Sequence, residues 1–302
     1  MEHMTVYQEN SIIPAQASHD GEVLAMWLHG KAARTATEYG REAGRFMEAM
    51  GKPLRSVTLS DLQGYVDSLD VAPATQARTI ASIKSLFSFG RKIGYLAFDP
   101  AAVVRSPKLK NRLGERILPE SDVVRLIAME SDKRNRALLV FLYATGARIS
   151  EACKLTWADV QVLEEGAAIV TLYGKGGKTR HVRLEARQWA PVESLREGIS
   201  HAAPVFRSQK GGFLDQSAVN RIVHAAAKRA GISAPVSPHW LRHAHVSHAL
   251  DHGAPAHLVQ QTAGHESLAT TSRYAHAEVG VMDALVPSGT RKRTLKRGDA
   301  RR

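Results

Sequence analysis

The chain has very little cysteine and no long apolar run. Its 302 residues include a single cysteine, Cys153, so neither an internal disulfide nor a cysteine-based zinc pattern is possible. Cys153 lies in an apolar helical run, where a free cysteine acts as a small core residue. No stretch of about 18 apolar residues is available to cross a bilayer, and the N-terminus lacks the apolar core of a signal peptide. We therefore expect a cytoplasmic protein.

Acidic residues are scarce relative to basic ones. Lysine and arginine number 41, against 29 aspartates and glutamates, so the net charge is +12. Such an excess favours a polyanionic partner, with nucleic acid as the first candidate and an anionic membrane surface as the alternative. The segment G-K-G-G-K-T at 174–179 lacks the spacing of a nucleotide-binding phosphate loop. The length suggests two domains of ordinary size.

Apolar residues at helical spacing predict a first, helical domain at residues 18–98. Its four helices are expected near residues 20–28, 35–50, 58–69 and 74–93. The fourth helix carries polar and cationic residues outside its apolar positions, namely Thr75, Arg78, Thr79, Lys84 and Arg91. These residues either form the solvated face of a bundle or contact DNA.

A basic connector is expected at residues 99–118, where no apolar periodicity persists. Its cations are Arg105, Lys108, Lys110, Arg112 and Arg116. A poorly structured basic segment suits a protein that wraps around DNA, although it could also be a merely soluble linker. Residues 1–17 are expected to be flexible, and residues 286–302 form a basic tail.

The second domain, residues 119–285, is predicted to be mainly helical with a small β-hairpin. Helices are expected near residues 119–129, 136–145, 185–199, 215–230, 239–251 and 255–263. Residues 167–172 and 181–184 alternate like strands, and Gly176 and Gly177 suit the turn between them.

Chemically active side chains cluster between Ser237 and His276. Pro238 suits a helix start, and His239 and Arg242, three residues apart, then share a face. His265 and Tyr274 are nine residues apart, so an unbroken helix would place them on opposite faces. If they serve one site, the helix must break or bend. The weak helix formers at 270–272 are a plausible place.

Two earlier segments complete a set of six residues. Arg148 lies in A-T-G-A-R-I-S-E and Lys175 in G-K-G-G-K-T-R. The ordered set Arg148, Lys175, His239, Arg242, His265 and Tyr274 resembles the pattern of the tyrosine recombinase (phage integrase) family, close to its Xer-type members. The resemblance covers the C-terminal two thirds well and the N-terminal third only in size and helical character.

The resemblance implies both a fold and an activity. The fold is an N-terminal helical core-binding bundle that grips DNA, followed by an α+β catalytic domain. The activity is site-specific recombination through a 3′-phosphotyrosyl intermediate, without ATP, metal or another cofactor. The implied partner is a double-stranded recombination site. Four subunits would assemble on two such sites, either all identical or including a related recombinase.

The family assigns each of the six residues a role. Tyr274 is the nucleophile and His239 its general base; Arg148, Arg242 and His265 stabilise the phosphoryl oxygens; Lys175 protonates the leaving group. Glu151 occupies an acidic position that supports the site. Arginine forks match phosphoryl oxygens, and a tyrosine with a pKa of about 10 needs help in losing its proton.

Other interpretations of these residues stay open. Arg148 could simply pair with Glu151, Lys178 is a rival for the role of Lys175, and Tyr143 and Tyr173 are rivals of Tyr274. The histidines at 243, 245, 248 and 252 invite a metal site, but no carboxylate completes a zinc motif. Alternative functions are a type IB topoisomerase-like nicking-closing enzyme, a DNA-binding protein that has lost cleavage, and a small-molecule phosphatase.

The segment after Tyr274 carries a short apolar set. Its members are Val279, Val281, Met282, Leu285 and Val286. They could pack on their own domain, or, as the resemblance implies, dock in a neighbouring subunit and tie cleavage to assembly.

Overall fold

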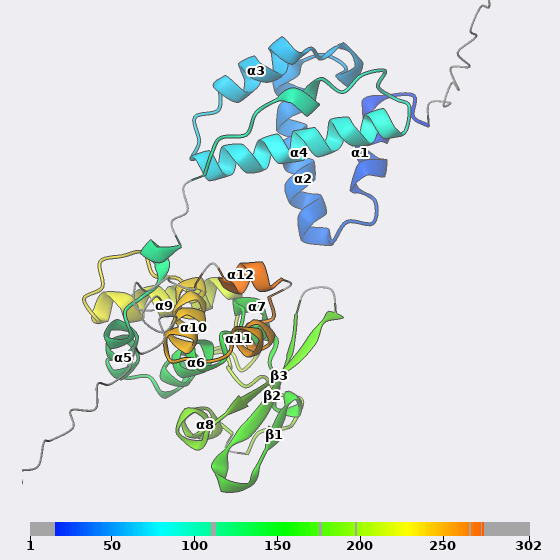
Figure 1. Cartoon of the computed structure of the whole chain (residues 1–302). Helices are drawn as coiled ribbons and strands as arrows, with labels where there is room; N and C mark the ends of the chain where they lie inside the picture. The colour runs from blue at the N-terminus through cyan, green and yellow to red at the C-terminus, as the bar shows by residue number, and fades with distance from the viewer. Residues whose placement is uncertain are drawn as a thin grey trace, which may run out of the picture. The chain divides into compact units, whose positions relative to one another are not determined.

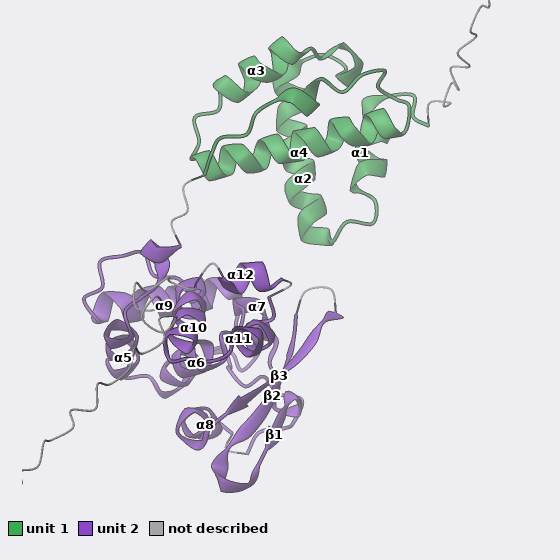
Figure 2. Cartoon of the chain, in the orientation of Figure 1, with its two compact units in different colours: residues 1–110 green, residues 111–302 purple. Residues whose placement is uncertain are grey.

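The computed structural model describes residues 16–109, 113–174, 177–196, 198–265, 267–272 and 274 (Figure 1). The chain divides into two compact units, residues 1–110 and residues 111–302 (Figure 2). Lys110, Arg112, Lys175 and the apolar set at 279–286 lie outside the described residues. No helix among the described residues is long and apolar enough to cross a membrane.

Unit 1 is a helical bundle, as predicted. Its helices are α1 (Asp20–Leu28), α2 (Ala33–Met50), α3 (Leu59–Asp67) and α4 (Pro73–Lys92), with short 3₁₀ turns η1 (Leu54–Ser56) and η2 (Pro100–Val103). Thr58 and Asp61 form a capping box at the start of α3, in which each side chain accepts a hydrogen bond from the other residue's backbone N–H. Pro73 occupies the first position of α4, where its missing N–H costs nothing.

The core of unit 1 forms where α4 packs against α1 and α2. Trp27, Phe46 and Phe87 are buried there, and the rings of Phe46 and Phe87 meet edge to face at 5.9 Å. Ile80 and Ile83 add aliphatic side chains from α4. Burying each such side chain contributes about 1.5–3 kcal/mol, so this bundle has the core of an independent unit.

The segment expected to be a basic linker is folded at both of its ends. Ala101 and Val104 are buried in the core of unit 1, and Leu118 is buried in the core of unit 2. Helical periodicity did not indicate this packing, because the buried residues lie in short turns rather than in a helix. Arg105 and Lys108 remain exposed.

Unit 2 is an α+β fold around a short antiparallel sheet. Its helices are α5 (Glu120–Ala128), α6 (Lys133–Thr145), α7 (Ile149–Lys154), α8 (Ala186–Glu193), α9 (Gln216–Arg229), α10 (Pro238–Asp251), α11 (Ala256–Ala263) and α12 (Leu268–Ser272). Its strands are β1 (Val160–Val162), β2 (Ala168–Tyr173) and β3 (Thr179–Leu184), in the order β1-β2-β3. Single-turn 3₁₀ helices are η3 (Gly114–Arg116), η4 (Trp157–Asp159) and η5 (Glu164–Gly166).

The predicted hairpin is confirmed and gains a third strand. β2 and β3 pair from Ala168 opposite Leu184 to Tyr173 opposite Thr179. β1 was not predicted, because three residues with two exposed side chains carry too little alternation. Helix α8 ends at Glu193, shorter than the predicted 185–199.

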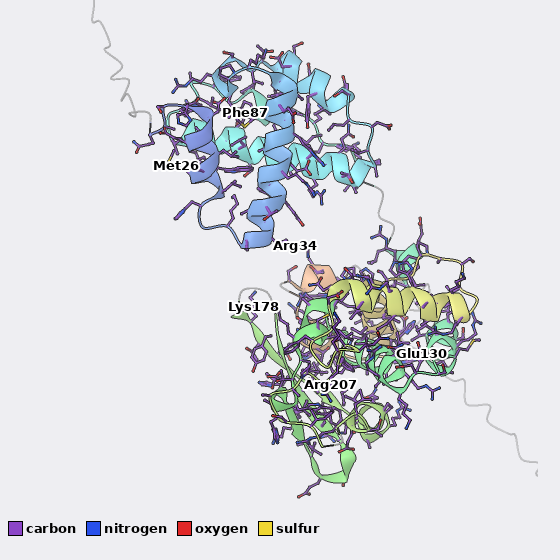
Figure 3. All side chains as sticks on the ribbon, turned by 180° about the vertical axis from the view of Figure 1, so that it is seen from behind. Met26, Arg34, Phe87, Glu130, Lys178 and Arg207 are labelled. Carbon is purple, nitrogen blue, oxygen red and sulfur yellow. The ribbon has the colours of Figure 1, made fainter. Side chains whose placement is uncertain are left out.

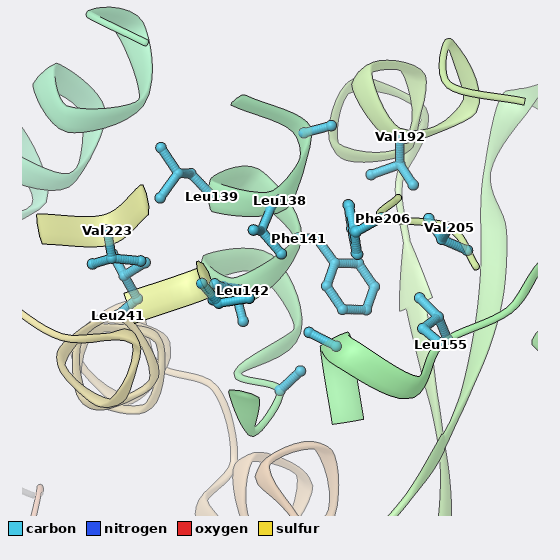
Figure 4. Close-up of a cluster of buried hydrophobic side chains, with 14 of the residues drawn as sticks. Leu138, Leu139, Phe141, Leu142, Leu155, Val192, Val205, Phe206, Val223 and Leu241 are labelled. Atoms are coloured by element: carbon cyan, nitrogen blue, oxygen red, sulfur yellow. The ribbon is translucent and has the colours of Figure 1, made fainter. Parts of the chain in front are cut away.

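Helix α6 forms the centre of the core of unit 2. It is apolar on most sides and packs against both α8 and α10. Figure 4 shows Leu138, Phe141 and Leu142 of this helix among side chains from α8, α9 and α10. The core thereby fixes α10, which carries Arg242, and the end of α6, where Gly146 accepts a hydrogen bond from Arg242.

The chain breaks after α11, at Gly264, six to eight residues earlier than the expected 270–272. Helix α11 ends at Gly264, whose φ of 65° is readily adopted only by glycine. Residues 270–272, the predicted break, are instead helical and belong to α12, so that prediction was wrong. Thr271 is fully buried, and its packing outweighs its weak helix propensity.

Candidate active site

Arg148 is held by two segments distant in sequence. It is the N-cap residue of α7, and its Nη1 donates to Glu151 Oε1 at 3.0 Å. Its Nη2 donates to the carbonyl oxygen of Gly264 at 2.8 Å. The expected Arg148–Glu151 pair is therefore present, but the bond to Gly264 also ties Arg148 to the end of α11. A third of the Arg148 side chain stays exposed, at 34%.

Glu151 is the buried anion at the centre of this network. Arg180 of β3 clamps it with two parallel bonds, Nη1 to Oε1 at 2.8 Å and Nη2 to Oε2 at 2.7 Å. Burial would raise the pKa of the Glu151 carboxyl, but the bonds from Arg180 and Arg148 outweigh it and lower the pKa. Glu151 is thus a carboxylate that fixes two arginines, in keeping with a supporting position.

Arg180 is a component of the site that the sequence analysis missed. Besides Glu151 it binds the carbonyl oxygen of Thr262 through Nε at 2.7 Å, and it is only 11% exposed. It therefore joins β3, α7 and α11. Its place in G-K-G-G-K-T-R, five residues after Lys175, was visible in the sequence, but nothing local distinguishes it from a solvated strand arginine.

Arg242 is a buried cation on α10. It is 3% exposed, and its Nη1 donates to the carbonyl oxygen of Gly146 at 2.5 Å. Burial, followed by the charge of Arg148, lowers its pKa to about 10, so it stays protonated at neutral pH. Among the described residues no carboxylate forms an ion pair with it. A buried guanidinium of this kind favours a bound anion.

Both arginines are positioned by a helix that ends in glycine. Gly146 ends α6 with a φ of 58° and offers its carbonyl to Arg242, while Gly264 ends α11 and offers its carbonyl to Arg148. A Cβ on Gly146 would lie 2.6 Å from Cδ2 of His245. Glycine is needed at Gly146 for both its backbone angle and its close approach to the imidazole.

Three imidazoles lie beside the arginines. His239 and His243 of α10 meet edge to face with ring centroids 4.4 Å apart, and His265 follows α11. Loss of hydration is the largest cause that lowers the pKa of all three, and the charge of Arg242 lowers each further; the pKa falls to about 4 for His243, to which His239 also contributes, and for His265. At neutral pH these rings are therefore uncharged in the absence of a bound anion. His239 is exposed at the surface, whereas His243 is buried.

Tyr274 is buried among these groups. It is 4% exposed, and its ring lies nearly parallel to that of His265 at 6.0 Å. Its hydroxyl lies 2.5 Å from Nδ1 of His243. Leu113 and Ile117, from the end of the expected linker, pack against the same apolar cluster. The break at Gly264 thus brings Tyr274 and His265 together, as a shared site requires.

The rival residues occupy different surroundings. Tyr143 of α6 bonds to His248, and burial raises its pKa to about 12. Tyr173 ends β2 and is largely exposed. Lys178 is exposed on the hairpin (Figure 3), and its carbonyl accepts from the Gly174 N–H at 2.7 Å. Lys175 lies outside the described residues, so the assignment between the two lysines stays a prediction.

The expected DNA contacts in unit 1 are not equally accessible. Thr79 is buried, and its hydroxyl donates to Glu42 at 3.1 Å, so its proposed contact with DNA is not available in this structure. Lys84 donates to the carbonyl oxygen of Val104. Arg78 and Arg91 are exposed and Thr75 is half-buried. Thr79 points inward because it lies on the buried side of α4, next to Ile80.

The remaining histidines that the structure describes lie outside any metal-binding cluster. Within the described ranges, no group of three or more His, Cys, Asp and Glu side chains is placed to share a metal ion. His248 pairs with Tyr143, and His252 lies 3.4 Å from Glu120.

The comparisons with known proteins agree with this geometry. Residues 116–280 match the sequence pattern described as the Phage integrase family. The chain belongs to the phage integrase family. The tyrosine recombinase XerC of Xanthomonas campestris pv. campestris (strain B100) is 34% identical over 236 residues, which cover 75% of this chain and 72% of XerC. The tyrosine recombinase XerD of Shewanella oneidensis is 33% identical over 251 residues, covering 78% and 82%.

A solved structure shares the fold. The lambda integrase tetramer bound to a Holliday junction has a TM-score of 0.69 at 17% identity, over 86% of this chain and 78% of that one. At this identity the likeness establishes the fold. The phage integrase match at 116–280 includes all six candidate residues, from Arg148 to Tyr274, and begins within the segment that packs beside Tyr274.

Proposed function

We propose that this chain is a site-specific DNA recombinase of the Xer type, which cleaves and rejoins strands through a phosphotyrosyl intermediate. Its membership of the phage integrase family and its XerC and XerD relatives support this activity. The observation that carries the proposal is that Tyr274, Arg148, His239 and His265 gather around the buried Arg242. Arg148 and Tyr274 are 126 residues apart in the sequence (274 − 148).

The scissile phosphate would lie between the two arginines. Arg148 and Arg242 are each fixed by a glycine carbonyl, so their remaining N–H groups are preorganised for phosphoryl oxygens. His239 and His265 add hydrogen-bond donors at the same place. Removing one preorganised donor typically raises the barrier by about 3–4 kcal/mol. The electrostatics of the site therefore supply a large part of the proposed rate enhancement.

The reaction is a transfer between two oxygen nucleophiles. The Tyr274 oxygen attacks phosphorus while the bond to the 5′-oxygen breaks, which yields a 3′-phosphotyrosyl link and a free 5′-hydroxyl. Lys175 is the proposed proton donor to that leaving oxygen, with Lys178 as its rival. The phosphotyrosyl bond keeps the energy of the broken phosphodiester, so the proposed rejoining step consumes no ATP and needs no metal or other cofactor.

The proposed substrate is double-stranded DNA in a cytoplasmic setting. The net charge of +12 suits a polyanion, and the exposed Arg78, Arg91, Arg105 and Lys108 would add phosphate contacts from unit 1. The lambda integrase neighbour is a tetramer bound to a Holliday junction. By analogy we propose four subunits on two sites, with the apolar set at 279–286 docking in a neighbouring subunit.

The test is covalent capture of the cleaved strand. The full chain is incubated with nicked, cleavage-trapping duplexes from a plasmid library, and the adduct is isolated by denaturing electrophoresis and sequenced. We expect an adduct on Tyr274 that persists in excess chelator and disappears in Tyr274→Phe while DNA binding is retained. An adduct on Tyr143 or Tyr173, or no adduct on any sequence, would refute the proposal.

One measurement separates recombination from the topoisomerase-like alternative. Supercoiled plasmid without a captured site is incubated with the chain, and relaxation is followed on agarose. A recombinase leaves this plasmid supercoiled and recombines plasmids that carry the captured site. Efficient relaxation of any plasmid would favour the nicking-closing enzyme.

A further inference from the structure

The hydroxyl of Tyr274 contacts a histidine outside the six-residue family pattern. His243 lies one turn after His239 on α10, and its Nδ1 is 2.5 Å from the Tyr274 oxygen. The two rings are inclined by 37°, with centroids 5.5 Å apart. Both residues are buried. This distance meets the first requirement for a general base, which is to lie within hydrogen-bonding reach of the proton that it takes.

The same helix carries the histidine of a second tyrosine–histidine pair, whose tyrosine, Tyr143, belongs to α6. One turn and a half further along α10, Nδ1 of His248 lies 2.9 Å from the hydroxyl of Tyr143. Its ring centroids are 5.9 Å apart, close to the separation in the first pair. The hydrogen bond alone therefore does not identify an active pair. The surroundings distinguish the two pairs, because, of the two, only the His243–Tyr274 pair adjoins both His265 and His239.

We propose that His243, and not His239, accepts the proton of Tyr274 when that residue attacks the DNA phosphate. This inference rests on the recombinase function proposed above. The neutral ring carries its hydrogen on Nε2 and accepts at Nδ1. The O–H bond of Tyr274 breaks and an N–H bond forms at Nδ1, while the phenolate oxygen bonds to phosphorus and the 5′-oxygen departs. During rejoining the proton returns from Nδ1 to the departing tyrosine oxygen.

The groups around His243 make it neutral before DNA binds and a better base afterwards. Burial lowers its pKa, and so do His239 and Arg242 on its own helix, Arg116 of η3, and His265 after α11. A phosphodiester bound at Arg242 and His265 brings negative charge to the same place. Negative charge raises the pKa of a nearby imidazole, so substrate binding strengthens the acceptor at the moment of attack.

The experiment measures single-turnover cleavage of the captured site at saturating protein. His243→Asn keeps an acceptor near the position of Nδ1 but cannot take a proton at neutral pH; His243→Gln is the second variant if the first folds poorly. The matched control is His248→Asn, which alters the equivalent pair beside Tyr143. Each protein is also made with a ring-fluorinated tyrosine at position 274, whose phenol ionises at lower pH.

We expect His243→Asn to bind DNA normally and to cleave about 100-fold more slowly, since general bases contribute roughly 10²–10⁴-fold. Its rate should rise steadily with pH, and fluorination of Tyr274 should restore much of it. His248→Asn should cleave normally.

The inference is wrong if the wild-type chain cleaves and His243→Asn cleaves as fast as His248→Asn. It is also wrong if His243→Asn is slow and fluorination does not rescue it, which would indicate a structural role. Absence of any adduct with the wild-type chain would refute the proposed function instead.

Discussion

Glu42 in unit 1 and Glu151 in unit 2 are buried glutamates that each pair with more than one arginine, but the two clusters differ in rigidity. In unit 1, Glu42 lies 3.4–3.9 Å from Arg41, Arg45 and Arg78, all more than half exposed. In unit 2, Arg148 and Arg180 lie 2.7–3.0 Å from Glu151, with two parallel bonds from Arg180. The two clusters contain similar charges and differ in their geometry.

The difference suggests two uses for an arginine cluster. Exposed arginines at long distances from their carboxylate are weakly held, so they can turn toward phosphates along a duplex. Arginines anchored by short, parallel bonds and by glycine carbonyls hold one geometry. Such a geometry suits a transition state, where preorganised donors avoid reorganisation during the reaction. Unit 1 therefore has the features of a binding surface and unit 2 those of a catalytic one.

The largest effect should follow from removing an anchored arginine of unit 2. Arg242→Ala should slow single-turnover cleavage by about 10²–10³-fold, because it deletes a preorganised donor to the phosphoryl oxygens. Arg78→Ala, in the cluster of unit 1, is the matched control and should weaken DNA binding without slowing cleavage at saturation. Equal rate losses in the two variants would contradict the contrast between the clusters.

Removing the carboxylate from unit 2 should destabilise the protein strongly. Glu151→Gln leaves Arg180, which is 11% exposed, without its anionic partner, and breaking such a buried pair costs roughly 3 kcal/mol or more. Urea unfolding should show a lower midpoint for unit 2. Cleavage should slow as well, because Arg148 loses one of its two anchors. A midpoint unchanged from wild type would show that the network adds no stability.

Unit 2 should also respond more strongly to acid. His243 and His265 have pKa values lowered from 6.5 to about 4, so below pH 6.5 the unfolded chain takes up protons that the folded chain does not. Stability should therefore fall from about pH 6.5 to pH 4. Glu151, whose pKa is also lowered, adds stability that is lost on further acidification.

The measurement is thermal unfolding at a series of pH values, with His265→Gln as the comparison. In that variant the melting temperature should fall less steeply between pH 6.5 and pH 4 than in the wild type. An identical slope in the variant would count against a lowered pKa at His265.

The smallest effect is expected at Glu42. Glu42→Gln preserves an acceptor for Thr79 and loses only long ion pairs to arginines that are more than half exposed, so stability should change by less than about 1 kcal/mol. Removing this anion should raise DNA affinity slightly at low salt, because the neighbouring arginines gain freedom to contact phosphates. Filter binding across a salt series tests it, and a weaker affinity would oppose the proposed role of this face.

Much of this protein could be predicted from local sequence alone. Helical periodicity located most helices of both units to within a few residues, although α12 was not predicted and α8 ends earlier than expected; alternation located β2 and β3. Arg148, His239, Arg242, His265 and Tyr274 were identified from residue types and order, and the structure gathers them. The helix and strand predictions succeed because periodicity and capping depend on neighbours a few residues apart. The five site residues are recognisable as chemical types, and their roles stay predictions.

The tertiary structure decided what depends on distant partners. Arg180 became part of the site through Glu151 and Thr262, 29 and 82 residues away. His243 is set apart from the other histidines of α10 by Tyr274, 31 residues later. Thr79 turned inward toward Glu42, and the chain broke at Gly264 rather than at the weak helix formers. Local helix propensities differ by less than about 1 kcal/mol between most residues. Burial of a side chain and a satisfied ion pair outweigh such differences. Contacts with distant partners therefore decide which of several similar side chains becomes part of the core or of the site.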